Sequence, residues 1–343
     1  MAHLDSLAAE LPLWFAAQAR PLPWRADADP YHVWISEIML QQTRVEAVIG
    51  YYHRFLSALP TLHDLAGVEE EQLLKLWEGL GYYNRARNLK KAAQQIEAQH
   101  GGVFPRTYDA IRALPGIGPY TAGAIGSICF DLPTPAVDGN VLRVVTRFEA
   151  DESNIDRERT KKEIAARLAP LYQPGLCGVM TQSLMELGAC VCVPNGAPHC
   201  DRCPLAGACR SADGGWMRLP VRDAKKARRQ IEKTVLILQC GDRVAIRKRK
   251  STGLLANLWE FPNYDVPAAE TPEAAQRAAE GLCGAAVALL DEQHYTHIFT
   301  HVEWHMTAFR FDCGALPADC TAATAAELEH VYALPSAFRP FTE

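Results

Sequence analysis

Two acidic residues and one glycine-rich turn are the parts of this 343-residue chain whose types and spacing best suit chemistry. Pro115-Gly116-Ile117-Gly118 follows a helix-like stretch, and Pro119 suits the first turn of a new helix. Free backbone amides at such a turn and at a helix N-terminus bind phosphate without a lysine. Twenty residues after Gly118, Asp138 opens another helical run. Either feature alone is ordinary, since aspartate is a common N-cap, but their order and spacing favour a functional interpretation over a structural one.

A second carboxylate stands in the segment from Trp34 to Arg44, which reads WISEIMLQQTR. Asp29-Pro30 is a typical N-cap and first-turn pair, and the apolar residues that follow recur at helical spacing. In such a helix Glu37, Gln41 and Arg44 share a polar face. Taken by itself, such a face of polar side chains can be a solvated surface.

The elements that must hold these groups are helices in the first part of the chain. Apolar spacing predicts helices over 69–80, 85–100, 108–114, 120–130, 141–150, 157–171 and 181–190. No strand pattern occurs before about residue 209. Farther on, β-type runs begin at Thr234 and Arg243, 268–281 is helical, and 305–311 alternates as a strand does. The sequence predicts an all-α domain followed by a smaller α+β domain, with the boundary between 214 and 232.

Composition and charge limit the class of protein. The chain is 48% hydrophobic and 22% charged, and it has neither a signal-peptide pattern nor an apolar run of about 20 residues. We therefore expect a soluble, cytoplasmic protein without a membrane partner, and a monomer. The net charge is −5, yet residues 218–250 hold twelve Lys or Arg and three acidic residues. Such a stretch is either a solvated connector or a surface for phosphates or a partner.

Four of the eleven cysteines are clustered, which in a large cytosolic chain indicates metal binding rather than disulfides. A zinc site usually has two C-x₂-C pairs, whereas this segment has one. The cluster consists of Cys192, Cys200, Cys203 and Cys209, separated by seven, two and five residues. Cys190 is an alternative to Cys192 as the first ligand.

The turn, the aspartate after it and the cysteine segment together resemble the endonuclease-III-like helix-hairpin-helix DNA glycosylases. The resemblance covers essentially the whole chain and is closest to the MutY-type adenine DNA glycosylases, which remove adenine paired with 8-oxoguanine. It implies a helical helix-hairpin-helix glycosylase domain at 1–215, a basic linker at 216–231 and an α+β Nudix-like domain at 232–343. It also implies a [4Fe–4S] cluster on the four cysteines, in an iron–sulfur loop at 190–210. The family's first cysteine interval is six residues, one shorter than the interval here.

Further residue types favour the adenine-specific members of this family. Relatives that also cut the strand have a lysine where this chain has Tyr120, and a phenol cannot form an imine. The string SEIMLQQT matches the family's helix, whose glutamate is the general acid and whose glutamines insert into the base stack. Tyr82 matches a tyrosine that wedges beside the damaged base. The resemblance assigns DNA contacts to Gln41, Gln42, Thr43, Leu80, Tyr82, Gly116 and Gly118.

The C-terminal region resembles the family's domain for reading the opposite strand. Phe299-Thr300-His301 matches a Phe-Ser-His loop that probes 8-oxoguanine, and threonine keeps the hydroxyl. Residues 270–281 lack the glutamate-rich core with which a Nudix hydrolase binds metal, so we expect this domain to bind rather than hydrolyse. The histidines at 294, 297, 301 and 305 are not assigned to a metal.

Release of adenine from deoxyribose needs an acid for the base and an anion for the oxocarbenium ion. The resemblance makes Glu37 the acid that protonates N7, which requires a pKa raised by burial. Asp138 would stay ionised beside C1′, while Tyr120 and Asn140 position the two carboxyl groups. The adenine pocket would contain Trp24, Arg25, Leu40 and Glu186, although core packing is the plain alternative for Trp24 and Leu40.

Three other functions remain open. One is a lyase that acts on oxidised pyrimidines, which Tyr120 disfavours. Another is a non-catalytic DNA-binding scaffold with a structural metal, and the third is a nucleotide pyrophosphatase that uses the C-terminal domain. The expected partner is double-stranded DNA that contains an 8-oxoguanine:adenine mispair.

Overall fold

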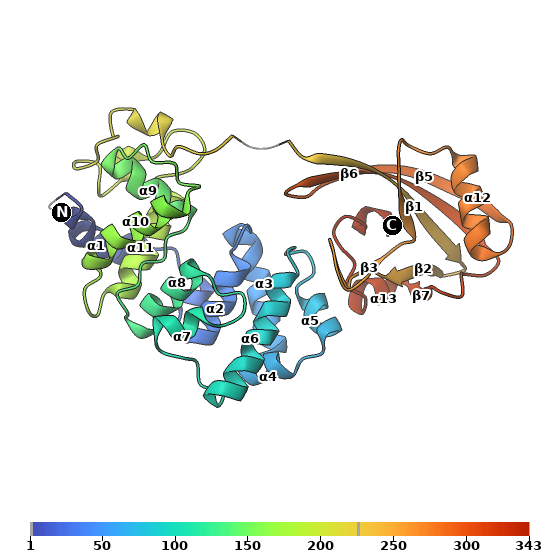
Figure 1. Ribbon diagram of the computed structural model, residues 1–343, viewed down its shortest axis with the longest axis horizontal. Coiled ribbons are helices and arrows are strands. Elements are labelled where there is room, and N and C mark those ends of the chain that lie inside the picture. The colour runs from blue at the N-terminus through green and yellow to red at the C-terminus, as the bar shows by residue number, and fades with distance from the viewer. Residues whose placement is uncertain (1–2, 225–226, 343) are drawn as a thin grey trace. The chain divides into compact units, whose positions relative to one another are not determined.

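The computed structural model describes residues 3–224 and 227–342, which divide into two compact units (Figure 1). The first unit runs from the N-terminus to Gly67 and includes Asn88–Ala224. The second consists of Val68–Arg87 and the residues after Ala224. Lys225 and Lys226 of the expected basic linker lie outside the described residues.

The first unit is built from helices, and its described residues contain no strand, as the sequence predicts. The expected helices are present with ends shifted by a few residues. The α-helices of this unit are α1 (Asp5–Gln18), α2 (Pro30–Met39), α3 (Val45–Ala58), α4 (Leu62–Gly67), α7 (Tyr108–Arg112), α8 (Pro119–Phe130), α9 (Gly139–Glu149), α10 (Glu158–Leu168) and α11 (Cys177–Cys190). Helix α6 (Asn84–His100) belongs to it from Asn88 onward. The short 3-10 turns are η1 (Pro23–Arg25), η2 (Ala169–Leu171), η3 (Cys200–Arg202) and η4 (Gly215–Arg218).

Local capping chemistry fixes where the helices near the predicted site begin. The Asp29 carboxylate caps α2 by accepting the Tyr31 N–H at 2.7 Å, and Asp138 caps α9 by accepting the Val141 N–H, also at 2.7 Å. Gly118 precedes α8 and provides no side-chain cap. The first amides of α8 are therefore not occupied by a cap, as a phosphate-binding turn requires.

The prediction that Glu37, Gln41 and Arg44 share one polar helix face is wrong. Helix α2 ends at Met39, and α3 begins at Val45, so Gln41 and Arg44 lie in the connection. Gln42 has φ of 61°, in the left-handed region that a continuing helix cannot adopt. Because the chain turns here, Gln41 and Arg44 do not share a helix face with Glu37.

Helices α9 and α11 approach closely in the core of the first unit, and α1 packs in the same core. A Cβ built on Gly188 of α11 would lie 2.6 Å from the Cβ of Asn140 on α9. Only glycine fits at this crossing, which holds the start of α9 against α11. The catalytic candidate Asp138 therefore precedes a firmly packed helix.

The second unit contains a mixed β-sheet with α12 (Pro272–Cys283) against one face (Figure 1). The main strand order is β3-β2-β1-β6-β5, with β4 paired to β1 and β7 to β2. The β1–β6 pair is parallel and the other pairs are antiparallel. The strands are β1 (Arg229–Cys240), β2 (Arg243–Lys248), β3 (Trp259–Glu260), β4 (Asn263–Val266), β5 (Val287–Ile298), β6 (Val302–Cys313) and β7 (Thr321–Thr324). The unit also contains α5 (Glu70–Leu76), α13 (Ala325–His330) and η5 (Arg339–Phe341).

The expected order of an all-α region followed by an α+β region is confirmed. Strand β5 was not predicted, because most of its side chains are exposed or half-buried and only Val287 is buried. Such a strand has no alternating apolar pattern to detect. In the described part of the chain, no helix combines the length and apolar character needed to cross a bilayer.

Candidate active site

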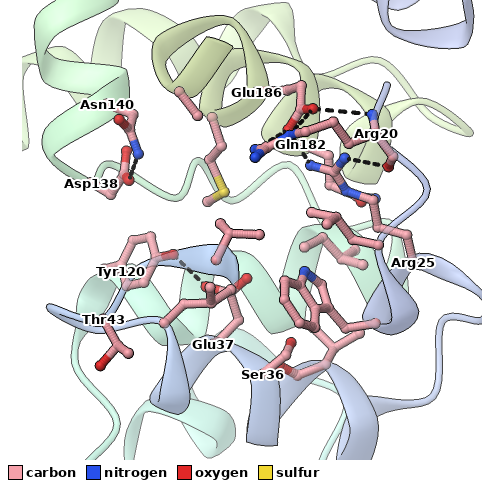
Figure 2. Close-up of a pocket in the computed structure, with 18 residues that line it drawn as sticks. Arg20, Arg25, Ser36, Glu37, Thr43, Tyr120, Asp138, Asn140, Gln182 and Glu186 are labelled. Atoms are coloured by element: carbon pink, nitrogen blue, oxygen red, sulfur yellow. Dashed lines mark hydrogen bonds and ion pairs between the residues drawn. The ribbon is translucent and has the colours of Figure 1, made fainter. Parts of the chain in front are cut away.

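The predicted catalytic and adenine-pocket residues converge on one cavity of about 180 Å³ in the first unit (Figure 2). Pockets for drug-sized ligands have roughly 300–1,000 Å³, so this one suits a fragment the size of a single base. The cavity is lined by all eight residues that the sequence assigned to catalysis or to the adenine pocket. They are Trp24, Arg25, Glu37, Leu40, Tyr120, Asp138, Asn140 and Glu186.

Glu37 of α2 is an almost fully buried carboxyl group, with 6% of its surface exposed. Burial raises the pKa of Glu37 to about 7; the Tyr120 hydroxyl and the Arg25 charge oppose this shift, and the negative charge of Asp138 adds to it. The Tyr120 hydroxyl, from the first turn of α8, donates a hydrogen bond to Glu37 Oε2. Burial also raises the pKa of Tyr120 well above its ordinary value. Tyr120 is therefore a neutral donor that fixes the Glu37 carboxyl.

Asp138 lies in the same cavity, in an environment with more donors. Its Oδ1 accepts the Val141 N–H, and its Oδ2 accepts the Asn140 side-chain amide at 2.7 Å. Burial raises the pKa of Asp138 above its ordinary value, and these hydrogen bonds and the charge of Arg143 offset only part of the shift. The donors occupy one oxygen each and hold the carboxylate in a fixed orientation.

Arg143 is a positioning residue that the sequence analysis did not single out. Its guanidinium is 5% exposed and donates to Asn140 Oδ1, the Gly188 carbonyl and the Cys192 carbonyl, each at 2.7 Å. It therefore connects the amide that holds Asp138 to α11 and to the cysteine segment. The motif Asp-Gly-Asn-x-x-Arg could have predicted the contact between Arg143 and Asn140, because the two residues are one helical turn apart.

Glu186 of α11 forms another wall of the cavity, with 1% of its surface exposed. Arg20 donates to it from its backbone and its guanidinium, the latter at 2.7 and 2.9 Å, and Arg25 donates at 2.9 Å. Burial by itself raises the pKa of Glu186, but hydrogen bonds from the two arginines outweigh burial and hold the pKa at about 2. Arg20 was missed, because 166 residues separate it from Glu186 and no local motif marks it.

A larger groove of about 850 Å³ adjoins this cavity and shares Leu40, Tyr120 and Asp138 with it. Gln41 and Gln42 line the groove, and Thr43 lines the smaller cavity. Lys161 and Lys162 from α10 face the same groove. The groove therefore combines cationic and amide side chains next to the two carboxyl groups.

The glycine turn before α8 has the geometry of an anion-binding turn. Gly116 has φ of 76°, and a Cβ there would lie 2.6 Å from the Cβ of Asn88, so glycine is required on both grounds. A Cβ on Gly118 would meet nothing within 4 Å. The backbone at Gly118 is thus open to a close-approaching phosphate.

The predicted DNA-contact residues of the second unit lie on two turns. Phe299 donates its N–H to the Val302 carbonyl at 2.9 Å, which closes a tight turn between β5 and β6, with Thr300 exposed at the turn. Tyr82 is 46% exposed, with φ of 47°, and its hydroxyl hydrogen-bonds to that of Thr300. Leu80 is 5% exposed and packs in the interior. Its assignment to DNA contact stays a prediction.

The cysteine segment gathers half-buried thiols near the C-terminal ends of α9 and α11. Among the described residues, no three His, Cys, Asp or Glu side chains converge as they would around a single metal ion. Burial raises the pKa values of Cys200, Cys203 and Cys209, and in each case the charge of Cys192 raises the pKa further. The four thiols therefore lie within electrostatic range of one another, which fits a multinuclear group.

The environment of the first thiol favours Cys192 over Cys190 as the first ligand. Cys192 Sγ accepts a hydrogen bond from Arg147 at 3.5 Å, whereas Cys190 Sγ lies 3.6 Å from Glu186 Oε1. The additional residue of the first interval is accommodated in a loop closed by a hydrogen bond from His199 N–H to the Val191 carbonyl. A neighbouring arginine charge favours the thiolate, which is the form of cysteine that ligates a metal.

Comparisons with known proteins agree with this geometry. Residues 35–170 match the family model of the HhH-GPD superfamily base excision DNA repair proteins, and residues 234–343 match the NUDIX domain. The adenine DNA glycosylase of Mus musculus is 32% identical over 93% of this chain and 73% of its own length. That of Schizosaccharomyces pombe is 35% identical over 79% of this chain and 70% of its own length.

Solved structures of related enzymes share the helical fold. A thermostable thymine-DNA glycosylase superposes with a TM-score of 0.56 at 27% identity, covering 62% of this chain and 97% of its own. A trapped endonuclease III–DNA covalent intermediate superposes with a TM-score of 0.51 at 26% identity, covering 60% and 93%. The fold, the glycine turn and the aspartate at the start of α9 define a helix-hairpin-helix DNA glycosylase of base excision repair. Within that class, the chain belongs to the adenine DNA glycosylase family.

Proposed function

We propose that this protein hydrolyses the N-glycosidic bond of adenine that is paired with 8-oxoguanine or guanine in duplex DNA. The observation that carries the proposal is the base-sized cavity in which a carboxyl group with a raised pKa, Glu37, shares the space with Asp138. One acid and one anion in distinct environments meet the two demands of glycosidic bond cleavage. The adenine must first leave the duplex, which costs less at a mispair than at a matched pair.

In this proposal Glu37 donates its proton to N7 of the flipped adenine, with Tyr120 holding the carboxyl in place. The base then departs as neutral adenine, and positive charge develops at C1′ of the sugar. Asp138 stabilises that charge, which in turn lowers the pKa of Asp138 during the reaction. Water adds to C1′ to complete the hydrolysis and leaves an abasic site. Glu186, fixed by Arg20 and Arg25, holds the far side of the base with a permanent negative charge.

We propose that the reaction is monofunctional. A strand-cutting glycosylase needs an amine that forms an imine with C1′. Among the described residues, those lining the cavity include no lysine, and Tyr120 stands where the family resemblance places the lysine of strand-cutting relatives. The two lysines of the adjoining groove lie on α10, where Glu158 pairs with Lys161 at 2.6 Å.

We further propose that Cys192, Cys200, Cys203 and Cys209 hold a [4Fe–4S] cluster. When bound, this group would tie the segment after α11 into one rigid loop. Arg143 and Arg147 contact that segment through the Cys192 carbonyl and thiol, and would transmit its rigidity to the start of α9.

The β5–β6 turn is proposed to read 8-oxoguanine on the opposite strand, with the exposed Thr300 hydroxyl as a donor or acceptor. Nucleotide hydrolysis by the C-terminal unit is disfavoured by the surroundings of its acidic residues. Glu270 accepts hydrogen bonds from Tyr264 at 2.6 Å and Thr234 at 3.3 Å, which fix it in the packing of the domain. Within α12 only Glu273 and Glu280 are acidic.

Single-turnover incubation with a strand-labelled duplex that contains one adenine opposite 8-oxoguanine tests the proposal. Strand cleavage at the adenine only after hot alkali is expected, together with no borohydride-trapped protein–DNA adduct. Cleavage without alkali, or a trapped adduct, would overturn the monofunctional assignment. Binding of the duplex with no cleavage under either condition would overturn adenine excision itself.

A further inference from the structure

Two cysteines outside the clustered segment lie against each other in the second unit. The Sγ atoms of Cys283 and Cys313 are 3.6 Å apart. Cys283 is the last residue of α12, and Cys313 is the last residue of β6. Strand β5 begins at Val287 and pairs there with Cys313, at the open end of the β5–β6 hairpin. The short connection from α12 into β5 thus brings Cys283 onto Cys313.

The two thiols differ in access to solvent. Cys313 is 4% exposed and belongs to the apolar cluster that includes Phe309 and Phe311, whereas Cys283 is half-buried. Burial raises the pKa of Cys313 to about 12, and its contact with Cys283 adds to the shift. Cys313 is therefore protonated at neutral pH, and Cys283 is the sulfur that an oxidant in solvent reaches first.

We propose that Cys283 and Cys313 are a modification site that closes to a reversible disulfide when the protein meets hydrogen peroxide. The Cys283 thiolate attacks one peroxide oxygen, the O–O bond breaks, and the sulfenic acid forms with release of hydroxide, which takes up a proton to become water. The sulfur of Cys313 then displaces the sulfenic hydroxyl, which leaves with the Cys313 proton as a second water. Overall, two thiols lose two electrons and two protons, and peroxide is reduced to water.

Closure requires only a small local movement. The S–S bond length is about 2.05 Å, so the sulfurs must approach by roughly 1.5 Å. Cys283 is at a helix end, where the backbone yields easily, and Gly284 follows it with φ of 69°. The bond would fasten α12 to the open end of the hairpin whose closed end is the Phe299–Val302 turn. The inference does not depend on the proposed glycosylase reaction.

Peroxide treatment of the full-length protein, followed by tryptic digestion without reductant and mass spectrometry, tests the inference. Cys283 and Cys313 fall on different tryptic peptides, so a disulfide appears as a cross-linked pair that dithiothreitol separates. We expect this pair in the wild type and its loss in Cys283→Ser. We also expect oxidation to raise the melting temperature of the C-terminal unit in the wild type but not in Cys283→Ser.

Cys320 provides the matched control, because it lies close enough for the charge of Cys283 to raise its pKa. No Lys or Arg separates it from Cys313, so both reside on one peptide. Cys320→Ser should form the cross-link as readily as the wild type. Loss of the link in Cys320→Ser would assign the bond to Cys320 and overturn the proposal. Persistence of Cys283 as a free thiol, or its conversion to sulfinic acid without cross-linking, would overturn it as well.

Discussion

Glu37 and Glu186 line the same cavity and are 6% and 1% exposed, yet their pKa values are shifted in opposite directions. Burial raises the pKa of Glu37 to about 7. At Glu186 burial acts in the same direction, but hydrogen bonds from two arginines overcome it and hold the pKa at about 2. Figure 2 shows Glu37 beside Tyr120 and Glu186 beside Arg20 and Arg25.

Burial acts in the same direction on both glutamates, so charged neighbours decide whether its effect on the pKa prevails. A phenol offers Glu37 one neutral hydrogen bond, which positions the carboxyl but cannot stabilise its charge enough to offset desolvation. Two guanidinium groups stabilise the Glu186 charge at every pH the protein meets. One carboxyl group is therefore available to give up a proton, and the other serves as a fixed anion.

Removing the proton of Glu37 should have the largest effect on the reaction. Glu37→Gln keeps the shape and can still accept the Tyr120 hydrogen bond, but it cannot act as an acid. We expect single-turnover adenine excision to fall roughly 100- to 10,000-fold. Duplex binding, measured by gel shift, should be retained. Excision within a few-fold of the wild type would assign the proton transfer to another group.

Asp138→Asn tests the anion separately from the acid. Asparagine caps a helix about as well as aspartate, so the free energy of unfolding should change little. Adenine excision should fall roughly 100- to 1,000-fold, because the charge that faces the developing cation is gone. Urea unfolding serves as the control. A matched loss of stability and activity would instead indicate a structural role for Asp138.

The sequence could predict those parts of the site that are built from local rules. The turn at Gly116 needs positive φ, and Asp138 is a helix cap; both requirements concern neighbouring residues. The acidity of Glu37 has a different origin. Burial raises the pKa, and the hydrogen bond that positions the carboxyl comes from Tyr120, 83 residues away in the chain; no periodicity shows either. The resemblance to a known family, rather than the pattern alone, supplied the role of Glu37.

The failures of prediction follow the same physical distinction. Arg20 and Arg143 act through long-range contacts to Glu186 and to the Gly188 carbonyl. The sequence prediction extended helix α2 beyond its true end, because the apolar spacing continues through Leu40. The backbone reverses direction at Gln42. Strand β5 lacks a buried face and therefore a pattern. Periodicity in the sequence shows neither the long-range contacts of the two arginines nor the local reversal at Gln42.

The pH dependence of excision distinguishes the roles of Glu37 and Glu186 without mutation. Glu37 must be protonated to act, so single-turnover excision should fall as pH rises above about 7, up to tenfold for each pH unit. Glu186 stays charged across this range and contributes no decline. The pKa of Glu37 is higher in the folded state than its ordinary value of 4.5. Protonated Glu37 therefore stabilises the fold fully below pH 4.5, and this stabilisation is lost as the pH rises through about 7. An excision rate that is flat from pH 6 to pH 9, measured at saturating enzyme, would contradict the acid role.

Glu186→Gln examines the other wall, where we expect a loss of stability and of base binding rather than of proton transfer. The variant leaves Arg20 and Arg25 without their shared anion, which should lower the free energy of unfolding by about 1–3 kcal/mol at pH 7. The folded-state pKa of Glu186 is lowered, so its stabilisation is present above 4.5 and is lost as pH falls toward 2. Urea unfolding at pH 7 and at pH 3 should show the difference between variant and wild type shrinking in acid. If Glu186→Gln changed the pH at which excision declines, Glu186 would be acting as an acid, and its role as a fixed anion would be contradicted.

Arg143→Lys should have the smallest effect, because it acts on Asp138 only through Asn140. An ammonium group cannot reproduce the planar donors that reach Asn140, Gly188 and Cys192 together, so the Asn140 amide loses its fixed orientation. We expect excision to fall roughly 10- to 100-fold with duplex binding unchanged. Arg147→Lys is the matched control, since Arg147 is equally buried on α9 and also contacts the cysteine segment, but donates to Leu219, Val193 and Cys192 instead of Asn140. If both variants lost activity in proportion to stability, the arginines would serve the fold alone; a loss specific to Arg143→Lys would show that the orientation of Asp138 is set from α11.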